Sequence, residues 1–152
     1  MTLPGVTPSR PDDLGEPDEI LAGALAAGDT ATALSRLLLA RVLLPVVARP
    51  ADDADAEMSV PALVDSGGKR ALPVFTGVES LRRWHAEARP VPMSGSRVVA
   101  GAVAEGYDGV VVDVAGPHPL QLVGPVLDRL GEAARRIATG NAGFVVGFAP
   151  PE

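Results

Sequence analysis

The stretch that decides the fold reads Asp65-Ser66-Gly67-Gly68-Lys69-Arg70-Ala71-Leu72-Pro73-Val74-Phe75-Thr76-Gly77-Val78-Glu79. Two adjacent glycines separate two apolar runs. That pattern predicts a β-hairpin with a two-residue turn, because a type I′ turn needs positive φ at both central positions. The stretch therefore predicts a turn, a strand and the beginning of a helix in close succession.

The hairpin turn can be centred in two ways, and side-chain pairing favours one of them. A turn centred on Ser66-Gly67 would set Leu63 against Arg70, an apolar residue against a charge. A turn centred on Gly67-Gly68 pairs opposite charges and matches apolar residues with each other, so we expect this register. It pairs Asp65 with Arg70, Leu63 with Leu72, and Val60 with Phe75.

A helix is predicted to follow the second strand. Thr76-Gly77-Val78-Glu79 has the spacing of a capping box, in which the threonine oxygen accepts from a free amide of the first turn and the glutamate reaches back. Leu81 and His85 then share a face with Val78, and Trp84 lies beside them. Phe75, just before this cap, is predicted to be a core residue.

Composition bounds the class of protein. The 152 residues are enough for one domain with a real core, and 47% of them are hydrophobic. The absence of cysteine excludes thiol catalysis, thiolate metal sites and disulfides. Residues 1–14 lack the apolar run of a signal peptide, and the longest apolar run, 37–48, is too short to span a bilayer. We therefore expect a cytoplasmic protein without a membrane segment, and twelve arginines against one lysine suggest a GC-rich bacterium.

Charge is distributed unevenly along the chain. The net charge is −6, yet residues 69–97 carry six basic and two acidic side chains, hence +4. This contrast predicts a basic surface that would attract an acidic protein partner. Nucleic acid is a less suitable partner, because the chain as a whole is acidic and Trp84 alone could stack a base near these arginines. The candidate protein-binding residues are Lys69, Arg70, Arg82, Arg83 and Arg89, and Arg97 belongs to the same segment.

Taken in order, the chain alternates helices and strands, which predicts an α/β (α+β) fold: a mixed sheet of about five strands with an internal hairpin and helices packed on it. Residues 1–15 are expected to be a disordered arm, 16–139 the folded domain, and 140–152 a glycine-rich break with a short apolar tail. Pro17 is expected at the first position of a helix that ends at Gly28, and Asp29 and Ser94 are expected to cap later helices. Residues expected on buried helix faces include Ile20, Leu21, Ala24, Val99, Val103, Val126 and Leu127.

The expected strands are less regular. Residues 42–48 form one, which Pro45 makes an edge strand or bulges. Residues 49–57 form an acidic loop without the spacing of a calcium loop. Strands follow at 58–64 and 69–75, residues 89–93 are extended because of their prolines, and 120–123 form a further strand. Residues 109–114 form the most buried strand, since three consecutive valines imply cover on both faces.

The run Arg70-Ala71-Leu72-Pro73-Val74-Phe75-Thr76, followed by Val78-Glu79-Ser80-Leu81 and Trp84, resembles the N-terminal domain of the SseB family, as does Gly109-Val110-Val111-Val112-Asp113 with Ala115-Gly116-Pro117. The resemblance covers roughly residues 17–137. It implies a small α/β bacterial domain without an established enzymatic activity. Because the family has no agreed catalytic residues, the resemblance implies none here.

No motif for chemistry stands out. Gly67-Gly68-Lys69 lacks both the upstream glycine and the following Ser or Thr of a phosphate-binding loop, and no serine has a nucleophile elbow. The best polar cluster is Asp113, at the carboxyl end of the most buried strand, with His118 and Asp108 as its expected neighbours. We therefore expect a non-catalytic interaction or regulatory domain without cofactor or metal. The alternative is a small-molecule binding protein or weak enzyme with a pocket near Asp113 and His118.

Overall fold

The computed structural model describes residues 13–48 and 58–138. The expected acidic loop at 49–57, the apolar tail and most of the N-terminal arm lie outside the described residues. The helices are α1 (Glu19–Ala27), α2 (Thr30–Leu39), α3 (Val78–Trp84), α4 (Gly95–Ala104) and α5 (Gly124–Ala138). The strands are β1 (Arg41–Ala48), β2 (Met58–Ser59), β3 (Leu63–Val64), β4 (Arg70–Val74), β5 (Arg89–Ser94), β6 (Gly109–Val112) and β7 (Leu120–Val123).

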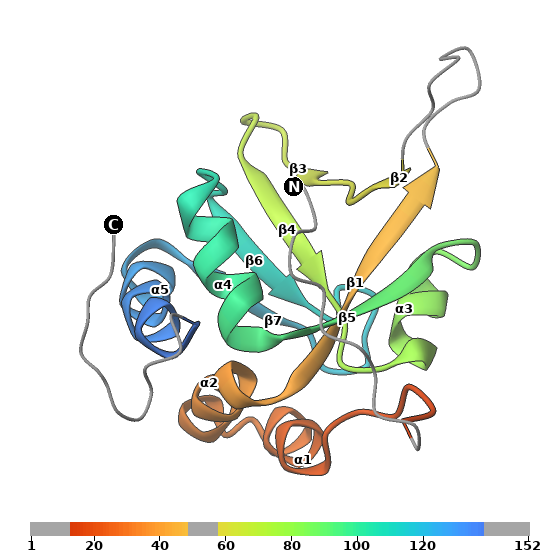
Figure 1. Cartoon of the computed structure of the whole chain (residues 1–152), viewed down its shortest axis with the longest axis horizontal. Coiled ribbons are helices and arrows are strands. Elements are labelled where there is room, and N and C mark those ends of the chain that lie inside the picture. The colour runs from red at the N-terminus through yellow and green to blue at the C-terminus, as the bar shows by residue number, and fades with distance from the viewer. Residues whose placement is uncertain (1–12, 49–57, 139–152) are drawn as a thin grey trace.

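The described strands form two small sheets that share one junction (Figure 1). The first sheet has the order β2-β1-β5, and the second has the order β3-β4-β6-β7. Only β4 and β6 are parallel; the other strand pairs are antiparallel. The sheets meet where Leu43 and Phe75 exchange two backbone hydrogen bonds of 2.8 and 2.9 Å. The predicted α+β class with mixed strands is confirmed, with seven strands in two sheets rather than about five in one.

Helix ends follow the predicted caps at most positions. The side chains of Asp29 and Ser94 accept from backbone amides of α2 and α4, and Gly28 ends α1 in the left-handed conformation. The prediction for Pro17 is wrong by two positions. Asp18 is the N-cap, because its carboxylate accepts from the amide of Leu21, and Pro17 therefore precedes the helix.

The β3–β4 hairpin has neither of the two registers considered. Leu63 pairs with Ala71 and Val64 with Arg70, which leaves a three-residue loop between Asp65 and Lys69. Within this loop only Gly68 has positive φ, at 84°, so the turn is a type I turn followed by a left-handed residue rather than a type I′ turn. The Asp65 carboxylate decides the geometry, because it accepts from the amides of both Gly67 and Lys69.

The strand predicted over 58–64 is divided between the two sheets. Met58 and Ser59 pair with β1, whereas Leu63 and Val64 pair with β4. Pro61 lies between them and has no amide hydrogen to donate to a ladder. β1 is the central strand of its sheet, so the expectation of an edge strand at Pro45 is wrong. The backbone tolerates this proline because β2 pairs only with Val47 and Ala48, and it is Pro90 of β5 that lies opposite Pro45.

Helices cover one face of the sheets. In Figure 1, α4 lies in front of β6 and β7, α5 lies to their left, and α1 and α2 lie below β1. The buried core on this face contains Leu21, Leu37, Val42, Leu44, Leu72, Val74, Val98, Val110, Val112, Leu122 and Leu127. Ile20, Val103 and Val126 were expected to be buried and are exposed. Val103 lies at the close approach of α4 to α5, where a Cβ at Gly131 would stand only 2.7 Å from its Cγ2.

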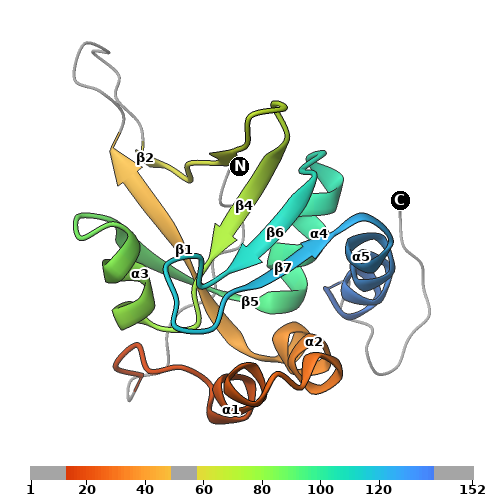
Figure 2. The same ribbon diagram turned by 180° about the vertical axis from the view of Figure 1, so that it is seen from behind.

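The other face of the sheets is covered only in part among the described residues. α3 packs over the junction of the two sheets, where Leu43, Phe75, Leu81 and Ala88 form a second buried cluster. Phe75 is fully buried, as predicted, and its ring lies 5.6 Å from that of Trp84. Figure 2 shows β4, β6 and β7 from this side, in front of α4 and beside α3. No described helix lies over these three strands.

Candidate functional site

Asp113 lies at the carboxyl end of β6 and joins that strand to the beginning of α3. Its Oδ1 accepts from the amide of Thr76 at 2.9 Å and from Oγ of Ser80 at 2.8 Å, and its Oδ2 accepts from Oγ1 of Thr76 at 2.7 Å. The carboxylate is almost fully buried, at 4% exposure. A buried charge is tolerated when it is hydrogen-bonded in this way. Asp113 therefore joins the end of β6 to the beginning of α3.

The backbone at Asp113 is unusual as well. Its φ is +52°, in the left-handed region that Asp and Asn enter more readily than most residues. The chain then turns sharply, since the amide of Gly116 donates to the carbonyl of Asp113 and the Gly116–Pro117 peptide is cis. This turn carries the chain toward His118.

The predicted capping box at Thr76 does not form. The N-cap of α3 is Gly77, which has no side chain to accept a hydrogen bond, and the hydroxyl of Thr76 donates to Asp113 instead. Glu79 lies 3.9 Å from Arg83 in an exposed ion pair along the helix. Sequence spacing suggested a local cap, but the partner of Thr76 comes from a strand far along the chain.

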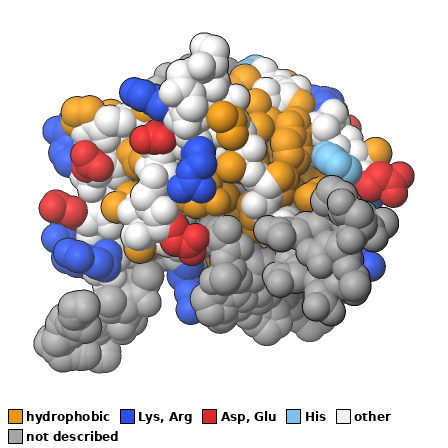
Figure 3. Space-filling model, turned by 90° about the horizontal axis from the view of Figure 1, so that it is seen from above, with side chains coloured by type: hydrophobic (Ala, Val, Ile, Leu, Met, Phe, Trp, Pro, Cys, Tyr) orange, Lys and Arg blue, Asp and Glu red, His pale blue; other side chains and the backbone are white. Residues whose placement is uncertain are grey.

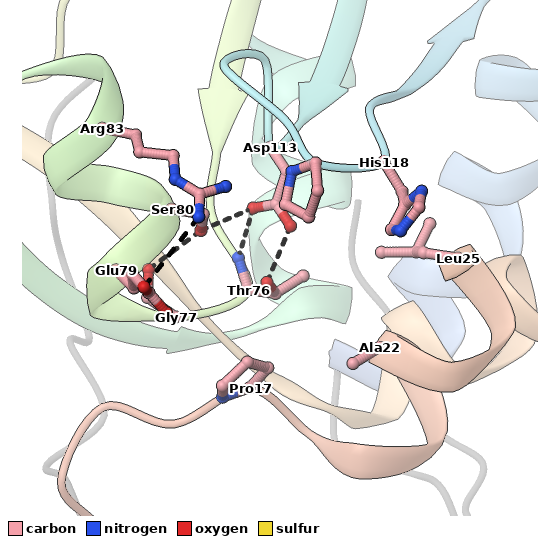
Figure 4. Close-up of a pocket in the computed structure, with 11 residues that line it drawn as sticks. Pro17, Ala22, Leu25, Thr76, Gly77, Glu79, Ser80, Arg83, Asp113 and His118 are labelled. Atoms are coloured by element: carbon pink, nitrogen blue, oxygen red, sulfur yellow. Dashed lines mark hydrogen bonds and ion pairs between the residues drawn. The ribbon is translucent and has the colours of Figure 1, made fainter.

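A pocket of about 170 Å³ lies beside this cluster, lined by Asp113 and His118 together (Figure 4). Ala22 and Leu25 of α1 form an apolar wall, and the His118 imidazole lies next to Leu25. His118 is exposed and makes no hydrogen bond to Asp113, whose acceptors serve Thr76 and Ser80. The structure thus brings the two predicted residues to one pocket without joining them in a proton relay. Asp108 lies at the other end of β6, where it accepts from the amide of Arg70.

Residues 13–17 pass beside this pocket, and Arg41 holds them in place. The Arg41 guanidinium donates to both carboxylate oxygens of Asp13, at 2.9 and 3.0 Å, and to the carbonyls of Glu16 and Thr76. The Gly15 carbonyl accepts from the amide of Val78 at 2.8 Å. The approach is close enough that a Cβ at Gly77 would lie 2.9 Å from the Gly15 oxygen. Of these residues, Pro17 lines the pocket.

A larger groove of about 670 Å³ runs over the uncovered part of the second sheet. Strand alternation explains its floor, because Leu72, Val110 and Leu122 point into the core and the residues next to them point the other way. We call this surface the open face. It consists of Leu63, Val64, Ala71, Gly109, Val111 and Val123, with Gln121 and Val114 beside them.

The open face contains large exposed apolar side chains. Val64 is 64% exposed and Val123 is 51% exposed. Hydrophobic side chains also gather among charged ones on the upper side of the molecule (Figure 3). Three consecutive valines predicted a strand buried on both faces, and all four residues of β6 are buried, Val111 at 9% exposure. The exposed apolar side chains of the open face belong to β3 and β7, which the sequence did not indicate. Only the small residues at positions 71 and 109, on neighbouring strands, could have suggested a hollow there.

The predicted basic residues do not all come together. Lys69 and Arg70 lie at the amino end of β4, on the rim of the groove, whereas Arg82 and Arg83 lie on α3, beyond the carboxyl end of that strand. The guanidinium of Arg70 stacks 4.6 Å above the Tyr107 ring. Arg89 begins β5 in the other sheet. The basic side chains of residues 69–97 are therefore divided among separate parts of the surface.

Two further findings concern residues 13–48 and 58–138. Within these ranges, no group of three or more His, Asp or Glu side chains is placed to hold a metal ion. None of the helices found there is long and apolar enough to cross a bilayer.

These features define a small α+β domain whose polar cluster ties a strand to a helix and whose second sheet is partly uncovered. The family model described as SseB protein N-terminal domain matches residues 18–129. The chain belongs to this family, which confirms the resemblance seen in its sequence. No curated protein and no solved structure matches the chain.

Proposed function

We propose that this chain is a non-catalytic protein-interaction domain and that the open face is the surface that binds the partner. The observation that carries the proposal is the groove over the second sheet, which no described helix covers and at whose sides Val64 and Val123 are exposed, although Val111 on its floor is buried. A sheet normally buries its apolar face against another layer, and contiguous exposed apolar patches mark interaction sites. The open face is such a patch, with Val64 and Val123 on its surface.

The chemistry of the polar cluster supports a role without catalysis. A general base must have a free lone pair directed at a substrate proton. The Asp113 carboxylate already accepts three hydrogen bonds from Thr76 and Ser80, which leaves about one lone-pair position, and His118 is not aligned by a hydrogen bond to it. The cluster is suited to fixing α3 against β6, which in turn shapes the edge of the open face.

The test uses two substitutions with matched exposure. Val64 lies on the open face and is 64% exposed, and Leu39 lies at the end of α2, away from it, and is 63% exposed. Tagged wild-type protein, Val64→Gln with Val123→Gln, and Leu39→Gln are used to recover partners from the native cytoplasm, and a recovered partner is then purified and titrated. We expect the Val64 and Val123 variant to lose at least tenfold in affinity and Leu39→Gln to bind as wild type.

Lys69 provides an independent readout. It is the only lysine in the chain and lies on the rim of the groove. Bound partner should therefore slow its reaction with an amine-specific reagent, while labelling of the α-amino group serves as an internal reference. Equal binding by all three proteins, with Lys69 labelled at the same rate in the complex, would contradict the proposed site.

The pocket beside Asp113 and His118 supports a second candidate function, binding of a small molecule. Its volume of about 170 Å³ corresponds to roughly five or six waters at about 30 Å³ each, so it could hold only a small ligand. A thermal-shift screen of small metabolites tests this function. If a compound is turned over by wild type and not by a folded His118→Ala variant, the domain is an enzyme and the non-catalytic proposal is wrong.

A further inference from the structure

The open face has the footprint of a single short helix. Adjacent strands lie about 4.8 Å apart and advance about 3.3 Å per residue, so four strands of at most five residues cover about 14 by 15 Å. An α-helix is about 10 Å wide, and ten residues span about 15 Å. A stable dimer needs about 800 Å² from each partner, several times the roughly 200 Å² of this face. The face therefore suits a small, transient contact with one helix rather than a stable dimer of this chain.

The adjoining half of the same face shows how a helix packs there. α3 covers the junction of the sheets through Leu81 and Trp84, which pack with Phe75 and Leu43. Val114 belongs to both halves, since it packs against this cluster and also lines the groove. A second helix on the open face would lie beside α3 and extend the same apolar layer.

The floor of the groove is lowest at Ala71, which lines it with a small side chain. Ala71 is paired with Gly109, and Gly109 is in turn paired with Val123. A Cβ at Gly109 would stand 2.9 Å from Cγ1 of Val123, so the Val123 side chain already occupies the space beside this glycine. The room for a large apolar side chain from outside is therefore over Ala71.

An extended peptide would suit this surface less well than a helix. The interior of a sheet face presents side chains, because the backbone groups of β4 and β6 are directed at neighbouring strands. A peptide strand gains most of its affinity from main-chain hydrogen bonds to a free edge. A helix satisfies its own backbone and needs only an apolar stripe.

We propose that the partner binds the open face through one amphipathic helix of about three turns, with a large apolar side chain seated over Ala71. This inference rests on the proposed function and specifies its partner. The rim carries Asp65 and Asp108 as well as Lys69 and Arg70, so polar residues of both charges would flank the helix.

The experiment titrates the ¹⁵N-labelled full chain with three synthetic 14-residue peptides of identical composition. One has leucines at helical spacing, one has them in strict alternation, and one has the helical pattern with a residue from its polar face exchanged with a terminal proline. We expect the helical peptide to shift the amide signals of Ala71, Gly109, Val111 and Val123 in a saturable way, and the other two peptides to bind at least tenfold more weakly.

A single substitution that fills the groove provides the second test, with a control elsewhere on the surface. Ala71→Leu points into the groove and should weaken the helical peptide at least tenfold, whereas Leu39→Gln should leave its binding unchanged, and the spectra of both variants report whether the fold is kept. If the alternating peptide binds the open face equally well, or Ala71→Leu has no effect, the helix inference is wrong while the proposed function stands. If no peptide shifts open-face amides, both the inference and the proposed site are wrong.

Discussion

At the scale of single residues, Asp113 is the position on which most of the local structure depends. It combines a left-handed backbone, near-complete burial and three donated hydrogen bonds. Hydrogen bonds to a charged acceptor contribute about 1.5–3 kcal/mol each, and leaving their donors unpaired in the interior costs about as much. The side chain therefore stabilises the junction of β6 and α3 by itself.

We expect Asp113→Ala to lower the free energy of unfolding by about 3–5 kcal/mol, because the amide and hydroxyl of Thr76 lose their acceptor and Ser80 keeps only the Gly77 carbonyl. Thr76→Val keeps the shape of the threonine and should cost about 1–2 kcal/mol. Urea unfolding of both single variants and the double variant measures their coupling. The two effects should fall short of additivity by about 1 kcal/mol or more, since the residues share a hydrogen bond. Strict additivity would mean that Thr76 acts on α3 alone, as a helix cap.

The sequence identified Asp113 as a notable residue but assigned the wrong role to Thr76. Local caps such as Asp29 and Ser94 were predictable because each accepts from an amide three residues ahead, a distance at which spacing is informative. The partner of Thr76 lies 37 residues away in the chain. No spacing rule applies to such a pair, and the alternative acceptor became visible only when β4 and β6 were placed side by side.

At the scale of the elements, the β3–β4 turn has a different type from the one that its two glycines predicted. Two glycines predicted positive φ at both positions, yet Asp65 fixes the turn by accepting from Gly67 and Lys69, and only Gly68 is left-handed. The hairpin was thus predictable, and its register was not, because a third loop residue moves every pair by half a step.

Two alanine substitutions distinguish the turn types. Gly68→Ala should cost about 1 kcal/mol, since a residue with a Cβ is strained at a φ of 84°. Gly67→Ala should be neutral or slightly stabilising, because alanine restricts the unfolded chain and position 67 has no positive φ. Thermal or urea unfolding of the pair provides the measurement. Equal losses of stability at both positions would indicate a type I′ turn instead.

The N-cap of α1 makes stability depend on pH. The hydrogen bond from Arg36 holds the pKa of Asp18 below its ordinary value of 3.8, helped by the amide of Leu21 and opposed by burial. A carboxyl whose pKa is lowered by folding stabilises the fold above its unfolded pKa, and this contribution is lost as pH falls through the folded pKa.

We expect Asp18→Asn to cost about 0.5–1 kcal/mol at pH 7, since asparagine still caps the helix and only the partly exposed ion pair is lost. The difference from wild type should shrink as the pH is lowered from about 4 to 2. Urea unfolding across this range measures it. Asp29→Asn is the comparison for a cap to which no arginine bridge is seen among the described residues. Hydrogen bonds from Thr32 also hold the pKa of Asp29 below 3.8, so its difference from wild type should shrink over the same pH range. A stability difference between Asp18→Asn and wild type that grows at low pH would contradict a lowered pKa of Asp18.

At the scale of the whole molecule, an acidic partner remains a prediction, and the division of the basic residues sharpens it. Arg82 and Arg83 lie together on α3, and Lys69 and Arg70 lie at the far end of β4. Attraction between opposite charges chiefly raises the association rate and weakens with salt. The two parts of the surface can therefore be tested separately.

Reversing Arg82 and Arg83 to Glu should slow association with an acidic partner at least tenfold at low salt and reduce the salt dependence, if α3 faces the partner. Reversal of Arg135 and Arg136 on α5 changes the net charge equally and provides the control. Stopped-flow association over a range of salt concentrations gives the rates. Unchanged rates in an intact Arg82 and Arg83 variant would mean that these arginines are merely solvated.

The architecture of the smaller sheet also has a kinetic consequence. β1 and β5 pair from Arg41 with Ser94 to Val46 with Arg89, so the intervening chain, including β4 and α3, must be gathered before this sheet closes. The parallel pairing of β4 with β6 encloses a further long segment. Closing such loops costs chain entropy before any contact compensates for it. The domain should therefore refold in about milliseconds to seconds rather than microseconds, and β7, which pairs with the segment just before it, should mainly govern how fast the native state opens.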